Sequence, residues 1–172
     1  MVINPSRVAE FGRLAKFAFD HKAQYLASVA GQVPWYGVAI LHRRESDANF
    51  STYLGNGDPL DRPTRHVPKN RGPFPDFPSG VRDALHLDGL DSVTDWRLEK
   101  LLYYFEIFNG TGYDLRGKPS PYIWGGTNVQ VRGKYTGDGH FDGGTMDTQP
   151  GCAPLLKAIM ALDPSVNPVR ES

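Results

Sequence analysis

The sequence has few of the groups that would stabilise it covalently or attach it to a charged partner. It contains one cysteine, Cys152, so no disulfide can form within the chain. Its 19 Lys and Arg residues balance its 19 Asp and Glu residues. This zero net charge gives no reason to expect a nucleic-acid partner. No uninterrupted apolar segment approaches the roughly 18 residues of a membrane-spanning helix, so we expect no membrane insertion.

Signals for metal binding and for export are also missing. The five histidines show no paired spacing of the kind that zinc sites use, and we expect neither a metal nor any other cofactor. The first residues lack a basic start followed by an apolar run, so no secretory signal peptide is predicted. We therefore expect synthesis in the cytoplasm, with outside help needed for any action beyond the membrane.

The residues that are present predict one mostly helical domain over residues 1–172, expected to be a monomer. At 40% hydrophobic residues the chain can bury a real core. Apolar residues recur at helical spacing in several segments. The predicted helices cover 5–30 with a break at Asp20-His21, a segment starting at Pro34 and ending near Glu45, 79–87 with Ser79 as N-cap, 95–108 capped by Thr94 or Asp95, a short turn at 121–124, and a final helix through Ala153–Met160.

One small β element is expected among these helices. Residues 50–66 alternate in polarity around Asn56-Gly57, a strong tight-turn signal, and so predict a hairpin. The prolines between 59 and 78 exclude regular helix or a central strand there and predict an ordered loop or lid. Residues 110–147 are glycine-rich and are predicted to be irregular. The expected fold class is α+β, mostly helical, with a hairpin beside the helix that ends at Glu45.

Glu45 is the most informative residue for function. It follows the buried run Val38–Leu41, and a carboxyl at a helix end against apolar side chains can have a raised pKa. Asp58, in the hairpin turn, and then Thr64 supply a second carboxylate and a hydroxyl. Glycoside hydrolysis by inversion needs two carboxyls about 6.5–9.5 Å apart, with a water between them. The alternative roles are a solvated helix end, a turn residue and a loop hydroxyl, and Asp47 or Asp61 could replace Asp58.

Aromatic and amide side chains suggest where a sugar would bind. Aromatic faces stack on sugar rings, and amides hydrogen-bond their hydroxyl and N-acetyl groups, although core packing or a solvated loop is an alternative role for each residue. Arg65 and Lys69 are placed to meet an anionic polymer. The candidate substrate-binding residues are Asn56, Arg65, His66, Asn109, Tyr113, Tyr122 and Trp124.

These residues together resemble a known group. Glu45, Asp58 and Thr64 resemble the Glu–Asp–Thr triad of phage-type lysozymes, with the same Asp-to-Thr spacing and a Glu-to-Asp gap a few residues longer. His42–Phe50 resembles the helix-end glutamate motif of the lysozyme and lytic transglycosylase superfamily. Phe105–Gly112 resembles its Tyr-Asn-Gly segment. Over roughly residues 33–160 the chain is similar to bacterial and phage proteins of the lysozyme family.

The resemblance implies a lysozyme-like fold and cleavage of the MurNAc–GlcNAc β-1,4 bond of peptidoglycan. It implies that Glu45 is the general acid, that Asp58 activates water or stabilises the oxocarbenium ion, and that Thr64 holds the water. Substrate is expected between the 95–108 helix and the hairpin. We expect an inverting muramidase, released by a holin or a secretion machine. The alternatives are a lytic transglycosylase, which needs no second carboxylate, and a non-catalytic wall-binding module.

Overall fold

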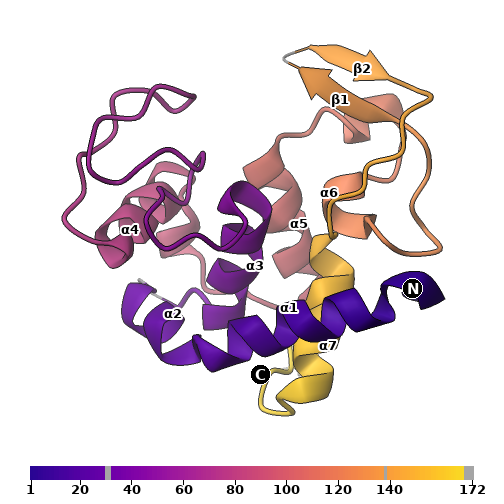
Figure 1. Cartoon of the computed structure of the whole chain (residues 1–172), viewed down its shortest axis with the longest axis horizontal. Helices are drawn as coiled ribbons and strands as arrows, with labels where there is room; N and C mark the ends of the chain where they lie inside the picture. The colour runs from indigo at the N-terminus through magenta and orange to yellow at the C-terminus, as the bar shows by residue number, and fades with distance from the viewer. Residues whose placement is uncertain (30–31, 138, 169–172) are drawn as a thin grey trace.

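The computed structural model describes residues 1–29, 32–137 and 139–168. It is an α+β fold, mostly helical, with one two-stranded antiparallel sheet among the described residues (Figure 1). No helix within these ranges is long and apolar enough to cross a membrane. In chain order the elements are η1 (Pro5–Arg7), α1 (Val8–Asp20), α2 (Lys22–Ser28), α3 (Trp35–Ser46), α4 (Phe77–Leu87), η2 (Leu90–Ser92), α5 (Leu98–Asn109), η3 (Asp114–Arg116), α6 (Pro121–Trp124), β1 (Lys134–Gly137), β2 (His140–Asp142) and α7 (Cys152–Leu162).

Helix α3 lies at the centre of the molecule, between α2 and α7 (Figure 1). All six residues from Gly37 to His42 are buried, which explains why this segment is apolar on every side. His42 is the polar exception: burial lowers its pKa to about 4, and its Nδ1 lies 3.0 Å from the Tyr25 hydroxyl. The ring is therefore neutral at physiological pH, and the centre of the fold carries no charge at this position.

The end of α3 is fixed by two residues in left-handed conformation. Asp47 (φ 56°) and Ala48 (φ 59°) turn the chain away from the helix axis. The Ala48 N–H then donates to the His42 carbonyl at 3.1 Å, which closes the last turn. Glu45 lies in this last turn, so the prediction that it sits at the end of a buried helix is confirmed.

The other helix predictions are confirmed except at their starts. The break near Asp20-His21 is real, and residue 30 at the end of that range lies outside the described residues. Helix α4 begins at Phe77, because the Asp76 carboxylate accepts the Ser79 N–H at 2.8 Å; Ser79 is not its cap. Helix α5 begins only at Leu98, so a start at Thr94 or Asp95 was wrong.

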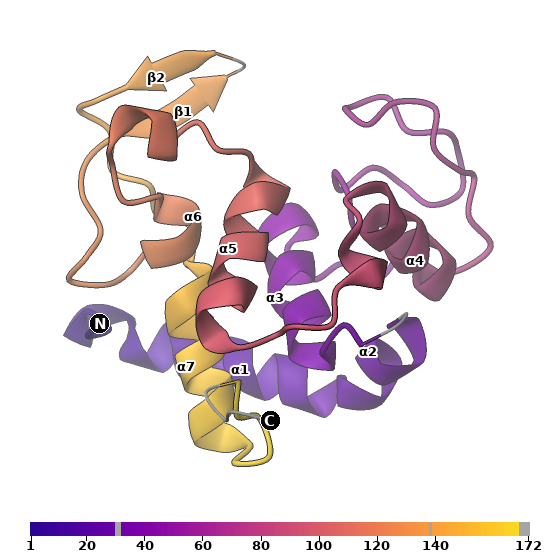
Figure 2. The ribbon, with the colours of Figure 1, turned by 180° about the vertical axis from the view of Figure 1, so that it is seen from behind.

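The predicted hairpin at 50–66 was wrong. Thr52 and Pro59 form an isolated bridge, flanked by Tyr53 N–H to Asp58 O at 2.7 Å and Leu60 N–H to Ser51 O at 3.1 Å. Pro59 has no N–H to extend the ladder, so the segment stays a loop. The sheet lies instead in the glycine-rich region that was predicted to be irregular, where Lys134 pairs with Asp142. The loop and the sheet lie on opposite sides of the α3 end (Figures 1 and 2).

Candidate functional site

Glu45 is a half-buried carboxyl held by one hydrogen bond. The Tyr122 hydroxyl donates to its Oε1 at 2.7 Å. Burial raises the pKa of Glu45 above its usual value, and the nearby Asp88 carboxylate raises it further, while the Tyr122 hydrogen bond and Arg44 act in the opposite direction. Its place in the last helical turn also disfavours a negative charge. The net effect is a carboxyl group that keeps its proton to a higher pH than an exposed glutamate.

Tyr122 is positioned by an unusually close contact between two backbones. It belongs to the short helix α6, which is followed directly by Gly125. The Gly151 N–H donates to the Gly125 carbonyl at 2.9 Å, and a Cβ on Gly151 would lie 2.4 Å from the Gly125 nitrogen. Only glycine permits this approach. It brings α6 against the start of α7 and places the Tyr122 hydroxyl at Glu45.

The guanidinium of Arg44 covers the ring of Tyr122. The guanidinium carbon lies 4.3 Å from the ring centroid, and one terminal nitrogen donates to the Pro150 carbonyl at 3.0 Å. Adjacent residues on α3 thus contact the two ends of one tyrosine: Arg44 its ring and Glu45 its hydroxyl. This arrangement fixes the rotamer of the carboxyl before any ligand arrives.

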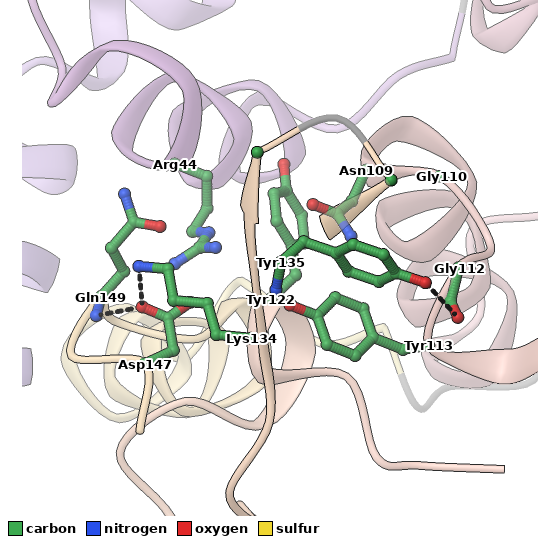
Figure 3. Close-up of a pocket in the computed structure, with 12 residues that line it drawn as sticks. Arg44, Asn109, Gly110, Gly112, Tyr113, Tyr122, Lys134, Tyr135, Asp147 and Gln149 are labelled. Atoms are coloured by element: carbon green, nitrogen blue, oxygen red, sulfur yellow. Dashed lines mark hydrogen bonds and ion pairs between the residues drawn. The ribbon is translucent and has the colours of Figure 1, made fainter. Parts of the chain in front are cut away.

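A cleft of about 360 Å³ adjoins this group. We call it the tyrosine cleft, because Tyr113, Tyr122 and Tyr135 form much of its wall (Figure 3). The Tyr135 N–H donates to the Tyr113 hydroxyl at 3.1 Å, and the Tyr135 hydroxyl donates to the Gly112 carbonyl at 3.1 Å. Its other lining residues are Arg44, Asn109, Gly110, Gly112, Lys134, Gly137, Gly139, Asp147 and Gln149.

A second cavity, of about 290 Å³, lies between Phe108 of α5, the end of α4 and the 53–68 loop. This is where the sequence placed the substrate, between the 95–108 helix and residues 50–66. We call it the Asp88 cavity: burial raises the pKa of the Asp88 carboxyl, and that group is near enough to Glu45 to raise the pKa of Glu45. Its lining residues are Tyr53, Gly55, Val67, Pro68, Ala84, Leu87, Asp88 and Phe108.

Asp58 is used by the loop that contains it. Its Oδ2 accepts the N–H groups of Arg65 (2.7 Å) and His66 (2.9 Å), and its Oδ1 lies 2.7 Å from His66 Nδ1. The His66 backbone hydrogen bond is the largest cause that lowers the pKa of Asp58. The turn does adjoin the acid, because a Cβ on Gly57 would lie 2.9 Å from the Glu45 carbonyl oxygen. The Asp58 carboxylate, however, is directed to the backbone of its own loop.

Thr64 and Asn56 belong to the same network. The Thr64 hydroxyl donates to the Pro68 carbonyl at 2.6 Å and accepts the Arg71 N–H at 3.0 Å, which leaves it little capacity to hold a water. The Asn56 amide donates to the carbonyls of His66 (3.1 Å) and Pro68 (3.3 Å). We call residues 55–71 the Asp58 loop. Its polar side chains stabilise the loop itself.

The remaining predicted residues divide between the cleft and the surface. Asn109, Tyr113 and Tyr122 come together in the tyrosine cleft, whereas substrate was expected between the 95–108 helix and residues 50–66. The expected place of Trp124 needs correction, since α6 directs it into a third cavity with Tyr103 and Glu106. Tyr122 and Trp124 are two residues apart in a helix, so their side chains point to different sides. The other charged candidates are exposed: Arg65, His66 and Lys69 on the Asp58 loop, Asp47 paired with Arg43, and Asp61 paired with Arg62.

Sequence reasoning missed the residues that complete the site: Arg44, Asp88, Lys134, Tyr135, Asp147 and Gln149. Arg44 could have been found from its position beside Glu45 in a helix. The others come from segments without a local signal. Among the described residues no group of three or more His, Cys, Asp or Glu side chains could hold a metal ion.

Comparison of the chain with protein-family models, with curated proteins and with solved structures yields no match. The functional assignment therefore depends on the geometry of the site.

Proposed function

We propose that the protein is a peptidoglycan hydrolase with a lysozyme-like fold, a muramidase in which Glu45 protonates the glycosidic oxygen of the MurNAc–GlcNAc β-1,4 bond. The observation that carries the proposal is the Tyr122–Glu45 hydrogen bond at the edge of the tyrosine cleft. A general acid must hold a proton near working pH and must be fixed in direction. Burial raises the pKa of Glu45 in the direction of the first property, and the Tyr122 hydrogen bond supplies the second.

The cleft suits a carbohydrate. Sugars expose hydroxyl groups at their edges and C–H groups on their faces, so they bind where aromatic rings and amides meet. The tyrosine cleft offers the rings of Tyr113 and Tyr135 and the amides of Asn109 and Gln149. Together with the Asp88 cavity it provides binding space on both sides of the end of α3, where Glu45 lies. A glycan strand, which continues on both sides of the scissile bond, needs such a layout.

The mechanism that follows gives Glu45 the role of acid, with Asp58 and Thr64 as positioning groups for the loop. In an inverting hydrolase Asp88 is a further candidate for the second carboxyl, because it lines the neighbouring cavity and its charge acts on Glu45. The protein would be made in the cytoplasm and released to the wall through a holin or a secretion machine, and would act as a monomer.

A lytic transglycosylase is the second candidate, and one observation favours it. That reaction uses one carboxyl as acid and then as base, and the hydrogen bonds of Asp58 and Thr64 leave Glu45 as the best-placed group. In this mechanism the MurNAc 6-hydroxyl, rather than water, attacks the anomeric carbon. A non-catalytic wall-binding module is the remaining alternative.

Digestion of purified peptidoglycan by the wild type and by Glu45→Gln, read by mass spectrometry, tests the proposal. Reducing-end muropeptides from the wild type alone would establish a muramidase that depends on Glu45. Products with 1,6-anhydro ends would establish the transglycosylase. If neither protein released products while both bound the glycan, the proposed catalysis would be refuted in favour of the binding module.

A further inference from the structure

Two cationic side chains line the tyrosine cleft, and only one of them has a carboxylate partner there. Lys134 Nζ lies 3.1 Å from Asp147 Oδ1, an ion pair drawn in Figure 3. Arg44 makes no ion pair within the described parts of the chain, and its Nε is buried without a hydrogen-bond partner there. Its contacts are the Tyr122 ring and the Pro150 carbonyl. The cleft lining therefore includes one cation without an ion pair, although the charge of Arg44 also acts on Glu45 at the edge of the cleft.

The charge balance of the cleft differs from that of the chain. Arg44 and Lys134 contribute two positive charges to its lining, and Asp147 contributes one negative charge. The Asp147 side chain is only 4% exposed, since it also accepts the Gln149 N–H at 3.0 Å. The Lys134 side chain is 32% exposed, and its ammonium has three donors. A ligand entering the cleft thus meets donors and positive charge, while the whole chain is neutral.

We infer that the tyrosine cleft recognises a carboxylate attached to the glycan strand. Lys134 is the specificity-determining residue, and the positive charge of Arg44 adds to the attraction for the carboxylate. The inference depends on the proposed function, because it names the substrate class of the same site. Neutral chito-oligosaccharides lack such a group. Peptidoglycan carries it in two places: the lactyl ether of MurNAc when the stem peptide is absent, and the side chains and terminus of the stem peptide when it is present.

The shape of the cleft supports a substituted sugar over a free anion. Lys134 and Tyr135 are consecutive in β1, so their side chains leave opposite faces of the strand, yet both line the cleft. The edge of β1 therefore borders the cleft, with the Lys134 cation on one side of the strand and the Tyr135 ring on the other (Figure 3). A sugar ring bearing an acidic substituent matches this pairing of groups.

The test uses matched substrates that differ only in charge. Peptide-free glycan strands with free lactyl carboxylates are compared with the same strands after conversion of the carboxylates to methylamides. For the wild type we expect kcat/KM to be about 10- to 100-fold higher on the charged strands, the range of a charge-assisted hydrogen bond. A parallel comparison uses strands that retain stem peptides, with the peptide carboxylates either free or amidated. It shows whether the cleft recognises the lactyl carboxylate or the carboxylates of the stem peptide.

The key variant is Lys134→Gln, which removes the charge but retains a donor for Asp147. It should lose most of the preference, measured as the ratio of kcat/KM on charged strands to kcat/KM on methylamide strands, and Lys134→Arg should restore that ratio. Lys118→Gln, which removes an exposed lysine from the third cavity, is the matched control and should keep the preference. Equal rates of the wild type on charged and amidated strands would overturn the inference, as would an equal loss by Lys134→Gln on both.

Binding distinguishes this inference from the proposed function. Calorimetry with Glu45→Gln, which should not cleave, measures carboxylate selectivity without turnover. If Glu45→Gln bound charged strands selectively while the wild type cleaved no strand, the carboxylate site would be supported and the enzyme refuted. Cleavage by the wild type with no selectivity in either measurement would support the enzyme and refute the carboxylate site.

Discussion

The two sides of Glu45 use their polar groups in opposite ways. In the Asp58 loop the side chains of Asn56, Asp58 and Thr64 are hydrogen-bonded to the backbone of the same loop. In the tyrosine cleft, Asn109 and Gln149 line open space, and Lys134 does so while it also pairs with Asp147. The loop contains the residues that stand out in the sequence, and the cleft contains the groups that a ligand can reach. A polar residue in a turn-rich segment is thus a poor guide to a site until its hydrogen bonds are known.

The two sides also act on Glu45 differently. The Asp58 loop contacts its backbone, through the turn at Gly57. The cleft side contacts its carboxyl, through Tyr122. Changes in the loop should therefore alter the stability and position of the site, whereas changes on the cleft side should alter the proton affinity of the acid.

The largest expected effect is on the acid itself. Glu45→Gln should lower kcat on peptidoglycan at least ~100-fold, the lower end of a general acid's contribution, with the fold unchanged by circular dichroism. Turnover close to that of the wild type would show that another group supplies the proton.

Asp58→Ala should destabilise the Asp58 loop and so test the structural role given to that side of Glu45. It leaves the N–H groups of Arg65 and His66 without their acceptor, and we expect the free energy of unfolding to fall by about 2–4 kcal/mol. Denaturant titration measures this loss. An Asp58→Ala protein with wild-type stability but no activity would contradict the positioning role and return Asp58 to the chemistry.

Tyr122→Phe should show whether the cleft side sets the pKa of Glu45. The ring that contacts Arg44 is retained, but the hydrogen bond that stabilises the ionised form of Glu45 is lost. The pKa of Glu45 should rise, so the fall in kcat/KM at high pH should move to higher pH. An unchanged pH profile would show that the titrating acid is not Glu45.

Asp88→Asn should move the same limb of the profile to lower pH. Removing the negative charge of Asp88 removes a group that raises the pKa of Glu45. The opposite signs of the two shifts make Tyr122→Phe and Asp88→Asn controls for each other. If Asp88 is also the second carboxyl of an inverting hydrolase, the maximal kcat will fall in addition to the shift of the pH profile.

The smallest effect is a gain in stability. A carboxyl with a raised pKa in the folded state favours folding while protonated, and that contribution is lost as the pH rises through the folded pKa. Glu45 is therefore destabilising at neutral pH. Glu45→Gln should melt at a higher temperature than the wild type at neutral pH, and the difference should vanish in acid. A lower melting temperature for this variant at neutral pH would contradict the raised pKa.

The sequence predicts the helices and the place of Glu45 because both depend on local patterns. Burial all around Val38–Leu41 identifies a central helix, and Glu45 must then lie at its end. The hairpin at 50–66 failed because Pro59 stops the ladder, which a turn signal at Asn56-Gly57 does not reveal. The cleft could not be predicted, since α3, α6 and β1 are distant in sequence and meet through tertiary contacts, such as Tyr122 with Glu45, that no local pattern reveals.

The buried thiol of Cys152 allows the rate of local opening around Glu45 to be measured. It lies in the first residue of α7, fully buried, and burial raises the pKa of the thiol. The charges of Arg44 and Glu45 act on this thiol, so it is buried close to the acid. A thiol reagent can react with Cys152 only when the packing around the start of α7 opens. Because the chain has a single cysteine, the rate of labelling reports that opening alone, with no other sulfhydryl signal to subtract.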